Sequence, residues 1–86
     1  MKWSCVHVDK VRRFSLEIDE ETGRTFIAIP VDIQWFTYLE WYEVDAQTFE
    51  RYRADPAFAF DFVERCKRHE MDHLLLFPPG PIRGWA

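Results

Sequence analysis

Residues 12–31 read Arg-Arg-Phe-Ser-Leu-Glu-Ile-Asp-Glu-Glu-Thr-Gly-Arg-Thr-Phe-Ile-Ala-Ile-Pro-Val. From Phe14 to Ile18 every second residue is apolar, and because successive side chains of a strand point to opposite faces, these residues turn one apolar side inward. The polar run Asp19–Arg24 contains Gly23, which tolerates the positive φ of a tight turn. Thr25–Val31 then resumes as a β-branched and apolar run. The whole stretch predicts a β-hairpin.

Two further segments have the character of strands. Residues 2–8 alternate, which predicts a strand with Trp3, Cys5 and His7 on one face. Residues 35–44 form a third long strand that carries bulky side chains on both faces. Pro30 has no amide hydrogen, so it predicts a strand end or a sheet edge.

The period of the pattern changes after this third strand. Asp45 is a candidate N-cap for a short helix over 46–54, and Asp55 followed by Pro56 is a second helix start, with a capping carboxylate before a proline. Beyond it lies an apolar stripe at helical spacing, made of Ala59, Phe62, Val63 and Cys66. We therefore expect an α+β fold in which a small antiparallel sheet of about four strands is packed on one face by two C-terminal helices.

The chain length allows one core. With 86 residues, of which 17% are aromatic, the composition fits a folded domain, which we place at residues 1–77. The run Leu74–Phe77 reads either as a short strand or as the last turn of a helix, and residues 78–86 form a Pro/Gly-rich arm. The longest apolar run, Leu74–Pro79, is far too short to span a membrane. The first residues show no apolar signal core, so we expect a cytoplasmic protein.

The charge is unevenly distributed. The net charge is −4, and residues 14–50 carry nine acidic residues against Arg24 alone, which gives this segment a formal charge of −8. Such a segment repels phosphate backbones, which argues against nucleic-acid binding. It would instead speed association with a basic protein.

The stretch 35–45, Trp-Phe-Thr-Tyr-Leu-Glu-Trp-Tyr-Glu-Val-Asp, is the strongest indication of binding. One interpretation is a central strand covered on both faces. The other is a surface of exposed rings with an acidic rim, because Trp and Tyr are favoured anchors at protein interfaces. On the second interpretation the partner-binding residues are Tyr38, Glu40, Trp41, Tyr42, Glu43, Asp45 and Glu50. This predicts a small non-enzymatic protein-binding domain, for example an immunity or antitoxin-like inhibitor of a basic effector protein.

A metal site is the alternative. Residues 69–73 read His-Glu-Met-Asp-His, and on a helix His69 and His73 share a face and would bind one zinc ion, with Glu70 as general base. The string His69–Leu74 resembles the third motif of peptide deformylases, which implies that the two histidines are ligands and Glu70 handles the proton. The glycine-rich segment and the Glu-Gly-Cys motif of that family do not occur here, so the family is not assigned.

The two cysteines allow a second metal interpretation. Cys5 and His7, together with Cys66 and His69, would form a tetrahedral site if strand and helix packed together. A disulfide between Cys5 and Cys66 is a further alternative, but free thiols are the expectation for a cytosolic chain. If the helix stops near Arg68–Met71, the helical spacing of the two histidines is lost, and we then expect no catalytic residue and no cofactor.

Overall fold

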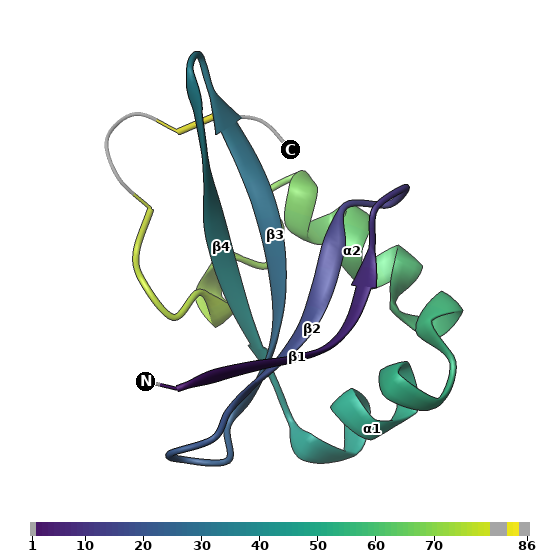
Figure 1. Ribbon diagram of the computed structural model, residues 1–86. Helices are drawn as coiled ribbons and strands as arrows, with labels where there is room; N and C mark the ends of the chain where they lie inside the picture. The colour runs from purple at the N-terminus through teal and green to yellow at the C-terminus, as the bar shows by residue number, and fades with distance from the viewer. Residues whose placement is uncertain (1, 80–82, 85–86) are drawn as a thin grey trace.

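Four consecutive strands form one antiparallel sheet in the order β1-β2-β3-β4 (Figure 1). The computed structural model describes residues 2–79 and 83–84. The strands are β1 (Trp3–Asp9), β2 (Phe14–Asp19), β3 (Thr25–Ile33) and β4 (Phe36–Val44). Each strand is joined to the next by a short turn, so the sheet is a simple meander and confirms the expected antiparallel arrangement.

The predicted hairpin is β2–β3. Gly23 has φ +76°, as the turn requires. Asp19 holds the turn: its carboxylate accepts hydrogen bonds from the backbone amides of Lys2 and Glu21 and from the Thr22 hydroxyl. This side chain is fully buried, and these donors satisfy its carboxylate in place of water.

The alternation predicted for β1 is broken. The register shifts between Cys5 and His7, so that Cys5 lies opposite Glu17 whereas His7 lies opposite Leu16. A bulge of this kind inserts one extra residue and changes the face to which later side chains point. Trp3 and Cys5 therefore do not share a face with His7, and this part of the sequence prediction is wrong.

Pro30 lies within β3 rather than at its end. It pairs with Leu39 of β4, and the last pair between β2 and β3 is Ser15 with Ala28. Pro30 is therefore in the part of β3 that has β4 on one side and no β2 on the other. Proline is tolerated there because no neighbouring strand on that side needs a hydrogen bond from a backbone amide at this position.

Two helical segments follow the sheet, as predicted. Helix α1 (Ala46–Ala54) begins at Asp45, whose carboxylate accepts the Thr48 amide at 2.7 Å. A 3-10 turn, η1 (Pro56–Ala59), is capped by Asp55 and leads into helix α2 (Phe60–Lys67). The start at Asp55–Pro56 is thus confirmed, although its first turn is tighter than an α-helix.

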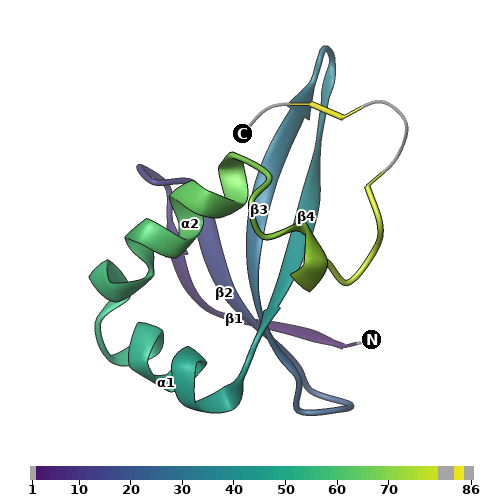
Figure 2. The same ribbon diagram turned by 180° about the vertical axis from the view of Figure 1, so that it is seen from behind.

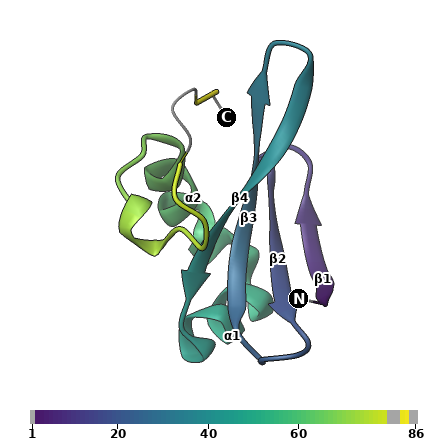
Figure 3. The same ribbon diagram turned by 90° about the vertical axis from the view of Figure 1, so that its left-hand side faces the viewer.

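The helices cover one face of the sheet only (Figures 2 and 3). The core between the layers comes from alternate residues of β2, β3 and β4 and from the inner sides of α1, η1 and α2. Its buried members are Phe14, Leu16, Ile27, Ile29, Tyr42, Val44, Phe49, Ala59, Val63 and Cys66. Within the described residues, no helix is long and apolar enough to cross a membrane.

The chain after α2 returns to the free edge of β4. A short 3-10 turn, η2 (Asp72–Leu74), precedes a single bridge between Leu75 and Tyr42, and the Leu76 amide donates to the Trp41 carbonyl at 2.8 Å. Residues 74–77 are thus neither a strand nor a continuation of α2. Of the proposed arm 78–86, residues 80–82 and 85–86 lie outside the described part of the chain.

Candidate functional site

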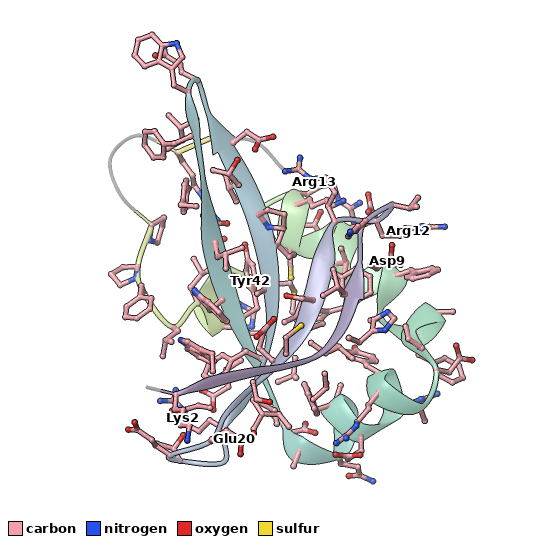
Figure 4. All side chains as sticks on the ribbon, in the orientation of Figure 1. Lys2, Asp9, Arg12, Arg13, Glu20 and Tyr42 are labelled. Carbon is pink, nitrogen blue, oxygen red and sulfur yellow. The ribbon has the colours of Figure 1, made fainter. Side chains whose placement is uncertain are left out.

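Two of the predicted contact residues belong to the interior. Tyr42 is fully buried and Glu40 is 6% exposed, because both lie on the face of β4 that the helices cover. The Tyr42 hydroxyl donates to Glu40 Oε1 at 2.9 Å and lies 3.2 Å from the Cys66 carbonyl, which ties β4 to α2. Figure 4 shows Tyr42 among the side chains behind the sheet. Glu40 and Tyr42 are therefore interior residues, and their prediction as partner-binding surface residues is wrong.

Arg83 neutralises this interior carboxylate. Its Nε and Nη2 donate to the two oxygens of Glu40 at 2.8 and 2.9 Å, and its Nη1 and Nη2 donate to the two oxygens of Asp72 at 2.6 and 2.9 Å. The planar guanidinium suits such paired contacts with carboxylates. One arginine from the end of the chain thus joins β4 to η2.

The protonation states follow from this geometry. Burial alone would raise the pKa of Glu40, but hydrogen bonds from Arg83 and Tyr42 outweigh it and lower that pKa. The hydrogen bonds from Arg83 also lower the pKa of Asp72. Burial, and then the nearby Glu40 carboxylate, raise the pKa of Tyr42, so its hydroxyl stays protonated. This is a fixed ion-pair network with no group poised to exchange protons near neutral pH.

The other predicted acidic residues also have intramolecular contacts. Glu43 accepts two hydrogen bonds from Arg24, at 3.0 and 2.6 Å. Asp45 caps α1. On the surface of the same helix, Glu50 Oε1 lies 3.7 Å from Arg53 Nη1. The acidic rim is therefore partly compensated within the molecule, and its local field is weaker than the sequence charge indicates.

The histidine pair is not on a helix. His69 has φ +63° and takes the left-handed position that ends α2. The amide of His69 donates to the Cys66 carbonyl and that of Glu70 to the Arg65 carbonyl, which is the hydrogen-bond pattern of a Schellman C-cap. His73 lies in η2, so the two imidazoles do not share a helical face.

The second metal interpretation fails for a different reason. Cys5 faces away from the core, on the other side of the bulge from His7, whereas Cys66 is buried on the inner side of α2. Both cysteines are free thiols. Across residues 2–79 and 83–84, no group of three or more His, Cys, Asp or Glu side chains is placed to hold a metal ion.

The opposite face of the sheet carries the candidate site. We call it the helix-free face. By strand register it consists of Trp3, Cys5, Val8, Ser15, Glu17, Phe26, Ala28, Pro30, Leu39, Trp41 and Glu43. At one end the Trp3 ring stacks on Trp41 with centroids 4.1 Å apart and meets the Phe26 ring edge-on at 5.1 Å. This aromatic cluster covers part of the sheet in place of a helix.

The other end of the helix-free face is an open groove of about 320 Å³. Its apolar walls include Val8, Pro30 and Leu39, of which Val8 is 54% and Leu39 is 45% exposed. Asp9 at the end of β1 and Arg13 in the β1–β2 turn border it (Figure 4). The groove therefore lies between the β1–β2 turn and the β3–β4 hairpin.

The tip of the β3–β4 hairpin adds two exposed rings. Trp35 is 91% and Phe36 is 61% exposed. The turn places Gln34 at φ +40°, and the hairpin extends beyond the helices (Figure 3). Trp35 lies in the turn between β3 and β4 rather than in the strand predicted over 35–44.

Val8 was not among the residues predicted for the surface. A Val in an alternating strand gives no sign of being exposed, and only its position on the face without helices leaves it open to solvent. Of the predicted set, Trp41 and Glu43 do lie on the helix-free face, whereas Tyr38 is half-buried on the opposite face.

Comparisons with known proteins returned no relationship: no family model, no curated protein and no solved structure matches the chain.

Proposed function

We propose that this chain is a small non-enzymatic protein-binding domain that contacts its partner through the helix-free face and the tip of the β3–β4 hairpin. The observation that carries the proposal is the exposure of Val8 and Leu39, which line one groove on the helix-free face, together with that of Trp35 and Phe36 at the hairpin tip. Exposed apolar residues scattered singly need no explanation, but several near one another mark interaction surfaces.

The chemistry of these residues suits a protein partner. Trp35 supplies a large ring at a projecting turn, and tryptophan is enriched among the residues that dominate interface energies. Val8 and Leu39 supply aliphatic area in the groove, whose polar lining residues are Asp9, Lys10, Arg13, Ser15 and Glu17. An apolar centre with a polar rim is the usual composition of such a surface.

We propose that the partner is a basic effector protein. The net charge of −4 favours long-range attraction to a cationic protein. An immunity or antitoxin-like inhibitor is the specific role that we propose, in which the domain covers the functional surface of that protein. Because Glu40 and Glu43 are paired within the molecule, steering would depend on the total charge more than on these two carboxylates.

Site-specific photo-crosslinking tests the proposal. A photoreactive amino acid replaces Trp35 in one variant and Arg53, on the exposed side of α1, in a control variant. We expect the variant at position 35 to capture one protein in the cells that express this chain, and the variant at position 53 to capture none. Equal capture at the two positions would argue against this surface.

The captured protein then allows an affinity measurement. We expect Trp35→Ala and Leu39→Ala each to weaken binding of the purified partner at least tenfold, the order of a typical hot spot. Glu50→Ala, on α1, serves as the control and should change affinity less than threefold. If the partner binds all three variants like the parent chain, the proposed surface is wrong.

A further inference from the structure

A buried carboxylate lies in the groove of the helix-free face. Glu17 projects from β2, is 8% exposed and lines the groove together with Val8, Pro30 and Leu39. Its neighbours across the strands are Cys5 on β1 and Phe26 on β3. The Cys5 thiol hydrogen-bonds to Glu17, and neither neighbour supplies a positive charge to the carboxylate.

The cations near Glu17 are directed elsewhere. Arg13, which also borders the groove, donates to both oxygens of Asp32 at 3.0 and 3.2 Å. Lys10 lies at the exposed rim, where water screens its charge strongly. Within residues 2–79 and 83–84, no ion pair includes Glu17, although buried charges in proteins are normally paired.

The groove has the composition that a long basic side chain needs. Its walls are aliphatic, and lysine and arginine lay their methylene stems along such surfaces while the charged end reaches a polar group. Glu17 is that polar group, and in this buried setting its attraction for a cation is stronger than that of a fully solvated carboxylate. The groove volume of about 320 Å³ is sufficient for one such side chain.

We infer that the groove receives a lysine or arginine side chain of the protein partner, with Glu17 as the group that binds its charge. The inference rests on the proposed function, because it specifies what the helix-free face contacts. It also gives the expected basic partner a defined point of contact, one that the sequence analysis placed on other residues.

Small cations test the groove without the partner. The full chain is titrated with n-butylammonium and with n-butylguanidinium, and amide shifts are followed by NMR; n-butanol and butyrate at the same ionic strength are the controls. We expect both cations to cause saturable shifts of the Val8 and Leu39 amide signals. The affinity for n-butanol should be at least tenfold weaker, and butyrate should not bind. The stronger of the two cations indicates whether lysine or arginine is preferred.

Substitution of the carboxylate gives the second arm. Glu17→Gln keeps the shape and removes the charge, and we expect it to reduce cation binding at least tenfold. Glu20→Gln makes the same change of net charge in the exposed β2–β3 turn and should leave cation binding unchanged. Circular dichroism confirms that both variants are folded. Equal binding of butylammonium and butanol, or no effect of Glu17→Gln, would overturn the inference.

The captured partner separates this inference from the proposed function. If Trp35→Ala weakens partner binding and Glu17→Gln does not, the surface stands and the cation site is wrong. If neither substitution weakens binding, the proposed surface itself is wrong. Loss of binding with both variants supports the two together.

Discussion

The two faces of the sheet come from alternate residues of the same strands, yet they differ in what covers them. On the helix-covered face, Leu16, Ile27 and Tyr42 are fully buried. On the helix-free face only part is protected, where Trp3 stacks on Trp41, and Leu39 remains 45% exposed. The alternating side chains of the strands thus form two faces that both carry apolar residues, and the helices bury only one of these faces. The other side stays partly exposed, and we propose that it contacts the partner.

The largest expected effect is on the covered face. Phe49 is fully buried between α1 and the sheet, so Phe49→Ala should lower the free energy of unfolding by about 3–5 kcal/mol. Leu39→Ala, on the helix-free face, should change it by less than about 0.5 kcal/mol. Urea denaturation measures both.

A loss of about 3–5 kcal/mol is a large part of the stability of a small domain and is enough to leave Phe49→Ala unfolded. Phe49→Leu then provides the measurement, with an expected loss of about 1.5 kcal/mol. Equal losses for Phe49 and Leu39 variants would contradict the contrast between the faces.

The Arg83 network should give the next largest effect. Arg83→Met leaves Glu40 and Asp72 without their cation, and removal of one partner of a buried pair typically costs about 3 kcal/mol. Arg53→Met, in a solvent-exposed pair, should cost less than about 0.5 kcal/mol. Thermal or urea unfolding of the two variants decides whether the chain end stabilises the covered face.

The same network predicts an acid dependence. The pKa values of Glu40 and Asp72 are lowered in the folded state, so their contribution to stability is present above the pKa values of the unfolded chain, about 4, and is lost as the pH falls through the lower folded values. We expect unfolding free energy to fall between about pH 4 and pH 2, and to fall less in Arg83→Met. An identical acid profile in the variant would exclude this origin.

The two thiols report on the two faces separately. Burial raises the pKa of Cys66 to about 12, and the Cys66 thiol is buried on the inner side of α2, away from solvent. The pKa of Cys5 is also raised, by burial and by Glu17, but this thiol is exposed. We expect iodoacetamide at pH 8 to label Cys5 at least about 100-fold faster than Cys66, because Cys66 reacts only after opening of the core. Mass spectrometry measures the ratio, which should approach one in concentrated urea.

The smallest expected effect concerns the start of α1. Asp45 was predicted to contact a partner, and its observed role is to cap the helix that covers the sheet. Asp45→Ala should cost about 1 kcal/mol, whereas Asp45→Asn retains a capping oxygen and should cost little. Equal losses for the two variants in urea denaturation would argue that the carboxylate charge, rather than the cap, is important.

Local sequence determined most of the architecture. The alternation around Phe14–Ile18 with Gly23 predicted the β2–β3 hairpin, and Asp45 and Asp55 marked the beginnings of the helical segments. These features depend on residues within a few positions of one another, whose preferences for strand, turn or cap operate without the rest of the chain. The end of α2 before His69, which the sequence analysis weighed as one alternative, is of the same kind.

The site depended on contacts between distant residues. The stretch 35–45 was predicted to be the binding segment, but Glu40 is paired with Arg83, which is 43 positions away, and the bulge in β1 separates Cys5 from His7. The groove around Glu17 exists because β1, β2, β3 and β4 bring Val8, Pro30 and Leu39 together. Sequence periodicity identifies which residues share a strand face, whereas only the packed layers decide which face the helices cover and which charges meet.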